Sequence, residues 1–192
     1  MATLTRRWAK TDATQQRILD AATEVFAARG FTAATMADIV DGSGASIGSI
    51  YHHFGGKREL FLAIFERLAA EIDRHIEEAA AAEPDRNRQR PFEGNIRAYL
   101  DAMWANRRAA MVLASGDTPA GFENLRRSSM HKGFRLWTSS LALDASPRGE
   151  LFTRTLISII AEASAMVILC EDQADVAPIS DATIEAIDRL TR

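Results

Sequence analysis

Apolar residues recur along the chain every three or four positions, which is the spacing of one face of an α-helix. No stretch alternates apolar and polar residues as a half-buried strand does, so the pattern predicts an all-α protein. The first helix carries an apolar stripe formed by Ile18, Leu19, Ala22, Val25 and Phe26. Gly30 is placed to end this helix in a left-handed conformation, after which Phe31 can pack back on Phe26.

Two short helices are predicted next. Thr35 and Asp38 have the spacing of a capping box, so the first of them begins after Thr35, and residues 42–44 interrupt it. Ser46 is a good N-cap for the second short helix, and the glycine pair at 55–56 ends it. Two short helices joined by a glycine-bearing turn, with a longer helix on each side, are typical of a helix-turn-helix.

A long fourth helix is predicted over 57–82, and the polar, proline-bounded segment that follows reads as a loop. Further helices are predicted from Phe92, over 107–114, from Pro119 with Thr118 as its N-cap, and near Pro147. Ser180 is expected to cap the last helix. We therefore expect an N-terminal three-helix domain with the helix-turn-helix, a DNA-binding motif, at 12–72 and a helical C-terminal domain at 73–192.

The charge balance changes this picture little. The net charge is −3, and residues 1–60 hold seven basic and six acidic side chains. Arg6, Arg7 and Lys10 precede the first acidic residue, and they form either a solvated terminus or an arm that contacts DNA. The single cysteine, Cys170, excludes an intramolecular disulfide and fits a reducing compartment.

No apolar segment near the start of the sequence has the character of a secretory signal. The longest apolar run, 155–170, contains Glu162 and two serines, and it is short and polar for a membrane span. We therefore expect a cytoplasmic protein that does not contact a membrane.

The second short helix has the side chains of a recognition helix, which enters the major groove by its N-terminal residues. Gly48 and Ser49 are small and allow a close approach to DNA, and Tyr51 and His52 can hydrogen-bond to phosphates. Lys57 opposes the macrodipole of the fourth helix unless a phosphate binds at the start of that helix. The sequence therefore predicts a phosphate contact for Lys57.

The residues from Gln16 to Phe26, Gly30-Phe31, Thr35, Ile39, the run 46–54, Lys57 and Leu60 together resemble the DNA-binding domain of the tetracycline-repressor (TetR) family. The resemblance covers roughly residues 12–70. It implies groove or phosphate contacts from Thr35, Ser46, Gly48, Ser49, Tyr51, His52 and Lys57. Ile47 stands where the family often has lysine, and it can either contact a thymine methyl group or be partly buried.

The resemblance also implies a transcriptional regulator rather than an enzyme. Such a protein forms a homodimer through its last two helices, binds a palindromic double-stranded operator, and is released when a small molecule binds the C-terminal domain. The sequence does not distinguish a repressor from an activator, although a repressor is the family's usual form. Seven apolar residues either form core or line a pocket for an apolar effector: Met103, Trp104, Met111, Phe122, Met130, Phe134 and Trp137.

Other functions fit the sequence less well. Residues 44–48 match the G-x-S-x-G pattern of hydrolases, but no strand precedes the serine as a nucleophile elbow requires. A dinucleotide fingerprint lacks its third glycine, where Ile47 stands. His52 and His53 are adjacent and point in different directions, so we expect no metal site and no cofactor. A helical scaffold whose helix-turn-helix no longer binds DNA is the remaining alternative.

Overall fold

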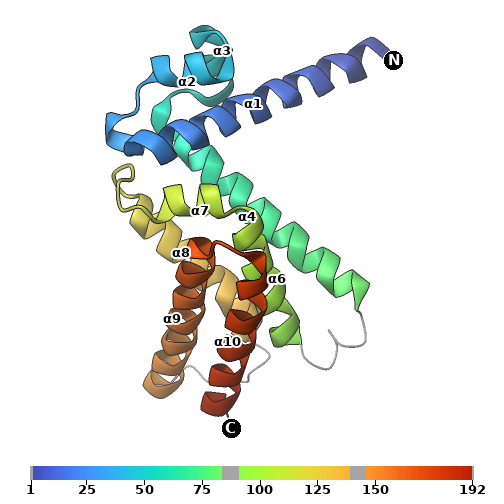
Figure 1. Cartoon of the computed structure of the whole chain (residues 1–192), viewed down its shortest axis with the longest axis vertical. Helices are drawn as coiled ribbons and strands as arrows, with labels where there is room; N and C mark the ends of the chain where they lie inside the picture. Colours follow the sequence, from blue (N-terminus) through green and yellow to red (C-terminus); the bar gives the residue numbers. More distant parts are fainter. Residues whose placement is uncertain (1, 84–90, 139–145, 192) are drawn as a thin grey trace. The chain divides into compact units, whose positions relative to one another are not determined.

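The computed structural model describes the backbone of residues 2–83, 91–138 and 146–191, and the side chains of 13–83, 92–133 and 146–191 (Figure 1). Within these ranges the regular elements are all helices, which confirms the all-α prediction. The chain forms two compact units. The first contains Met1–Leu68 and Arg108–Ala120, and the second contains Ala69–Arg107 and Gly121–Arg192. The domain boundary predicted between residues 72 and 73 stays a prediction.

The first unit contains α1 (Ala2–Ala33), α2 (Met36–Ser43), α3 (Ile47–Phe54), the beginning of α4 (Lys57–Ala82) and nearly all of α7 (Arg107–Ala114). α2 packs on α1, and α3 packs on α2 (Figure 1). The largest fully buried side chains in this unit are Ile18, Ile39, Ile50, Leu60, Phe61 and Ile64. Phe61 also belongs to a cluster of three aromatic rings with Phe26 and Phe31, whose centroids lie 5.3–5.7 Å apart.

The capping signals of the two short helices are confirmed. Thr35 and Asp38 form a reciprocal capping box at the start of α2, and Ser46 accepts a hydrogen bond from the Ser49 amide at the start of α3. Gly44 ends α2 with φ 63°. Gly30 has the expected positive φ of 76°, but its ψ of 166° is extended, and helical residues continue to Ala33. The ending of α1 is therefore a kink followed by a short turn.

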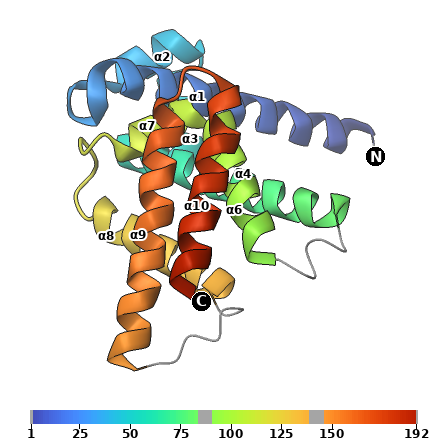
Figure 2. The same ribbon diagram turned by 60° about the horizontal axis from the view of Figure 1, so that its bottom comes forward.

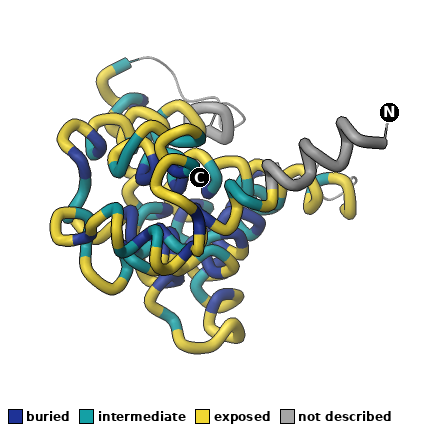
Figure 3. Tube along the Cα trace, turned by 90° about the horizontal axis from the view of Figure 1, so that it is seen from above, coloured by how far each residue is buried: buried dark blue, intermediate teal, exposed yellow. Residues whose placement is uncertain are grey.

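The second unit contains the rest of α4 with α6 (Pro91–Ala105), α8 (Phe122–Thr138), α9 (Pro147–Leu169), the short 3₁₀-helix η2 (Gln173–Asp175) and α10 (Val176–Thr191). α9 and α10 lie side by side, and α6 packs against both (Figure 2). Their inner faces form one apolar core that includes Ile96, Leu100, Leu156, Ile160 and Ile187. Buried and exposed residues alternate along these helices, as amphipathic helices require (Figure 3).

Two predicted helix starts are wrong. The helix expected from Pro119 begins at Phe122, because Gly121 has φ 81° and breaks the helical geometry between the proline and α8. Ser180 does not cap the last helix. It is buried inside α10, where its hydroxyl donates to the Val176 carbonyl 2.9 Å away, and the helix starts four residues earlier, after η2. The starts at Lys57, Arg107 and Pro147 are confirmed.

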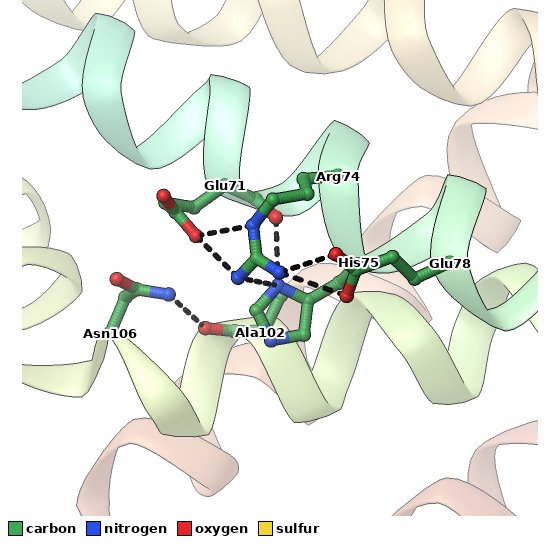
Figure 4. A network of polar contacts seen from close by, with 6 residues as sticks. All are labelled: Glu71, Arg74, His75, Glu78, Ala102 and Asn106. Carbon is green, nitrogen blue, oxygen red and sulfur yellow. Dashed lines mark hydrogen bonds and ion pairs between the residues drawn. The ribbon is translucent and has the colours of Figure 1, made fainter.

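The second half of α4 carries a polar network on its exposed side (Figure 4). Arg74 lies between Glu71 and Glu78, one turn away on either side, with nitrogen–oxygen distances of 2.7 Å to each. The His75 Nδ1 atom lies 2.8 Å from the Glu71 carbonyl oxygen. Exposed pairs of this spacing stabilise a helix by only about 0.2–0.5 kcal/mol each. The network therefore adds modestly to the stability of α4.

α9 begins at Pro147 and is therefore longer than the apolar run of residues 155–170. Among the described helices it is the one that is long and apolar enough to cross a membrane, by length and composition only. One of its faces, with Leu156, Ile160 and Val167, is buried in the core of the second unit.

Candidate DNA-binding helix-turn-helix

α3 is anchored by one residue and exposes most of the others. Ile50 is fully buried and fixes the helix in the core of the first unit. Ile47 and Tyr51 are 51% and 50% exposed, Gly48 and His52 are exposed, and Ser49 is half-buried. The predicted contact residues thus share the outer side of α3, where side chains can reach base edges and phosphates.

The exposure of Ile47 bears on the two roles that the sequence allowed. The side chain is not packed away against α2, so an apolar contact with a thymine methyl group remains available to it. The isoleucine side chain supplies no hydrogen bond. The two basic residues in the last turn of α3 are His52 and His53, and the helix contains neither lysine nor arginine.

The start of α2 already holds an anion. The Asp38 carboxylate accepts hydrogen bonds from the amide and the hydroxyl of Thr35, at 2.9 and 2.7 Å, and lies 3.0 Å from Arg29. The hydrogen bonds from Thr35 lower the pKa of Asp38 below its ordinary value. A phosphate that binds at Thr35 would share these two donors with Asp38.

Lys57 has partners that the sequence did not indicate. Its ammonium group donates to the carbonyl oxygens of Phe31, Thr32 and Ala34, at 2.8, 3.2 and 2.8 Å, and lies 4.7 Å from the centre of the Phe31 ring. The cation is unfavourable at the start of α4, but it complements the carbonyl groups at the end of α1. The phosphate contact of Lys57 stays a prediction, and this packing gives the lysine a second role.

Asp117 also binds the turn at the end of α1, through Thr32. Its carboxylate accepts hydrogen bonds from the Thr32 amide, with oxygen distances of 3.0 and 3.2 Å, and from the Thr32 hydroxyl. These bonds, chiefly the one from the hydroxyl, lower the pKa of Asp117. Asp117 follows α7, 85 residues along the chain from Thr32, and no local spacing signals the contact.

Two ion pairs add to the first unit. Arg67 of α4 lies 2.6 Å from Asp20 and donates to the hydroxyl of Thr23, both on α1. Arg108, in the first turn of α7, lies 2.9 Å from Glu24 of α1. Together with Asp117, Arg108 attaches α7 and the segment after it to α1 at two points.

The predicted effector residues do not form one cluster. Trp104 is buried in the core of the second unit, and Met103 and Met130 are partly buried against that core. Phe122 is also buried, whereas Met111 belongs to the first unit. The side chains of Phe134 and Trp137 lie outside the described residues.

The core of the second unit also holds a polar pair that sequence reasoning missed. Ser164 on α9 donates to the Tyr99 hydroxyl on α6, at 3.0 Å, and both residues are buried. Burial raises the pKa of Tyr99, while the hydrogen bond from Ser164 and the charge of Arg126 act in the opposite direction. A tyrosine within an apolar helical stripe gives no sequence signal that its hydroxyl is buried and paired. Among the described side chains no group of three or more His, Cys, Asp or Glu residues could hold a metal ion.

The comparisons with known proteins agree with the helix-turn-helix geometry. Residues 18–64 match the family model described as bacterial regulatory proteins, tetR family. This range contains every predicted DNA-contact residue, from Thr35 to Lys57.

Curated relatives match mainly in the same region. The regulator SrpR of Pseudomonas putida is 35% identical over 95 residues, which cover 50% of this chain and 42% of SrpR. The transcriptional activator FasR of Mycolicibacterium smegmatis is 37% identical over 90 residues, which cover 47% of this chain and 40% of FasR. The match thus spans less than half the length of either relative.

Solved structures share the fold of nearly the whole chain. A TetR-like regulator from Rhodococcus sp. RHA1 has a TM-score of 0.71 and 23% identity, and the match covers 93% of each chain. A regulator from Aquifex aeolicus VF5 also has a TM-score of 0.71, with 20% identity, over 92% of this chain and 99% of that one. The helix-turn-helix over residues 18–64 thus matches that of the tetR family of bacterial regulatory proteins, and the all-helical fold of the chain resembles that of TetR-like regulators.

Proposed function

We propose that the chain is a cytoplasmic, non-enzymatic transcriptional regulator that binds a specific double-stranded DNA sequence through α3. The observation that carries the proposal is the geometry of α3: Ile50 anchors it, Ser46 caps it, and its outer side is exposed. Ile47, Gly48 and Ser49 would face base edges, and Tyr51 and His52 would contact phosphates. Thr35 and Ser46 would add phosphate contacts at the two helix starts.

The relatives leave the direction of regulation open, because FasR is described as an activator and AcnR of Corynebacterium efficiens as a repressor. We propose a repressor for this chain, in line with the sequence-based expectation.

The test is selection of duplexes from a random pool by the purified protein, followed by a salt series on the enriched duplex and on a scrambled duplex of equal length. We expect a palindromic sequence to be enriched, and binding to weaken steeply as salt rises. Ser49→Ala should change which duplex is enriched, because under this proposal Ser49 would face the bases. Equal, weak binding to both duplexes would reject the proposal and favour a helical scaffold.

We further propose that two copies of the chain associate through α9 and α10. One side of α9 exposes a stripe of residues at helical spacing: Leu151, Thr155, Ser158, Glu162, Ala165, Met166 and Leu169. Leu151 and Leu169 are 67% and 72% exposed, and Leu190 of α10 is 44% exposed. The same side also exposes Arg154, which lies 3.0 Å from Glu150, and the hydroxyls of Thr155 and Ser158 donate to carbonyls of their own helix. The stripe thus combines apolar side chains with the two charged residues Arg154 and Glu162. A two-fold dimer would bury this surface and pair two recognition helices on a palindrome.

Leu169→Asp is expected to convert the dimer to a monomer, because it places a charge at the most exposed apolar position of the stripe. Sedimentation velocity would measure the change, and the enriched palindromic duplex should bind at least tenfold more weakly. Glu171→Lys, an exposed change two residues away, serves as the control and should leave the dimer intact. A wild-type chain that sediments as a monomer at micromolar concentration would contradict this proposal.

An effector site in the second unit is the remaining part of the proposal. The Tyr99–Ser164 pair is a polar group inside an apolar core, and ligand sites in proteins often combine these two features. We propose that a mostly apolar small molecule binds near this pair and lowers the affinity for DNA. Addition of candidate molecules to the protein–duplex complex would test for release.

A further inference from the structure

The last turn of α1 is held by two charged side chains of opposite sign. The Lys57 ammonium accepts no hydrogen bond and has three protons to donate, and three carbonyl oxygens of residues 31–34 lie within 2.8–3.2 Å of it. The Asp117 carboxylate binds the amide and hydroxyl of Thr32 in the same turn. Carbonyl groups and an amide group of one short segment are thus satisfied by side chains from α4 and from the segment after α7.

This turn leads directly into the helix-turn-helix. Thr35, the N-cap of α2, follows Ala34, whose carbonyl is one of the three that bind Lys57. Ala34 itself is buried, with 2% of its surface exposed. A turn fixed at both its carbonyl and amide groups leaves little freedom in the direction in which α2 begins, and α3 packs on α2.

We propose that Lys57 and Asp117 are positioning residues for DNA recognition: together they fix the turn that sets the orientation of α2 and α3, and Lys57 does so without contacting a phosphate. The inference rests on the proposed DNA binding, and it differs from the role that the sequence predicted for Lys57. The three protons of the ammonium group are already used within the protein. A phosphate contact would require at least one of these bonds to break.

The two roles of Lys57 predict different salt dependences. Loss of a phosphate contact lowers the slope of log Kobs against log[salt] by about 0.9 and weakens binding to every duplex alike. Loss of a positioning residue leaves the slope on the scrambled duplex unchanged, because Lys57 itself contacts no phosphate. It instead weakens binding to the enriched duplex selectively, since the recognition helix no longer presents its side chains in register with the bases.

The experiment uses the full chain, the duplex enriched by the wild-type protein, and a scrambled duplex. Lys57→Met keeps most of the side-chain length and removes the charge. Arg58→Met is the matched control, because Arg58 is the next residue, carries the same charge, and has 56% of its side chain exposed. Binding is measured by fluorescence anisotropy across a salt series, at a temperature where circular dichroism shows each variant to be folded.

We expect Lys57→Met to bind the enriched duplex at least tenfold more weakly, with a smaller preference over the scrambled duplex and an unchanged salt slope on the scrambled duplex. Arg58→Met should keep the preference. A slope lowered by about 0.9 with an equal loss on both duplexes would identify a phosphate contact and overturn the inference. A folded Lys57→Met variant with wild-type affinity would also overturn it, because the lysine would then contribute to stability alone.

Asp117→Asn provides the second, independent variant, and it decides the matter if Lys57→Met does not fold. It preserves size but removes a negative charge, so simple electrostatics would strengthen DNA binding. If Asp117 positions the turn, the variant should instead bind the enriched duplex several-fold more weakly. Asp41→Asn, on the exposed side of α2, controls for the change in charge. Tighter binding by Asp117→Asn would reject the inference. Failure of the wild-type chain to enrich any duplex would instead reject the proposed function itself.

Discussion

Phe61→Ala is expected to lower the free energy of unfolding of the first unit by about 3–5 kcal/mol, which is the usual cost of removing a buried aromatic ring. The side chain of Phe61 is fully buried, and its ring lies 5.7 Å from that of Phe26 and 5.3 Å from that of Phe31. These three rings join α4 to α1 and to the turn that Lys57 holds. Removal of the central ring leaves a cavity that the surrounding helices fill only partly.

Hydrogen exchange gives the cleanest measurement, because the two compact units need not unfold together. Amides of α1, α2 and α3 should exchange faster in Phe61→Ala, while those of α9 and α10 keep their protection. Phe65→Ala, one turn further along α4 at a half-buried position, is the control. It should lower the free energy of unfolding clearly less than Phe61→Ala does. A loss below about 1 kcal/mol for Phe61→Ala would show that the aromatic cluster is not the core of this unit.

Local signals in the sequence predicted much of the helix-turn-helix. The capping box of Thr35 and Asp38, the N-cap Ser46, and the bounds of α4 all depend on residues within a few positions of one another. Such interactions form between neighbours on one helix, so spacing alone reveals them. The exposed and buried sides of α3 follow from the same periodicity.

Contacts between distant segments could not be predicted in this way. Lys57 was expected to bind phosphate because its position opposes the dipole of α4, but the nearby carbonyls at the end of α1 supply the compensation. The contact of Asp117 with Thr32 joins positions 85 residues apart.

The prediction that Ser180 caps the last helix was wrong for a different, local reason. A serine inside a helix can donate to the carbonyl four residues earlier, and the sequence does not distinguish that role from capping.

The division of the chain into two compact units could not be predicted from local patterns either. Residues Arg108–Ala120 belong to the first unit, although both α6 before them and α8 after them belong to the second. Arg108 and Asp117 attach this segment to α1 through single side chains. No local pattern of apolar and polar residues distinguishes such a segment from the helices on either side of it.

Gly30→Ala is expected to have the second large effect, because two independent features of the structure require glycine there. Its φ of 76° and ψ of 166° lie in a region that residues with a Cβ atom essentially do not occupy, and strain of this kind costs about 1–3 kcal/mol. A methyl group on Gly30 would also overlap with the Oδ2 atom of Asp117. The variant should therefore lose stability and also displace the carboxylate from Thr32, with a loss of preference for the enriched duplex.

A double-mutant cycle separates the two causes. In an Asp117→Ala background the overlap is absent, so Gly30→Ala should cost only the backbone strain, and the difference between the two backgrounds measures the clash. Gly48→Ala is the control for glycine replacement within the same unit. Gly48 lies inside α3 with open space where a methyl group would project, so alanine should leave stability unchanged or raise it by up to about 1 kcal/mol. Equal costs of Gly30→Ala in both backgrounds would show that backbone strain alone requires the glycine, and that Asp117 can move without consequence for the turn.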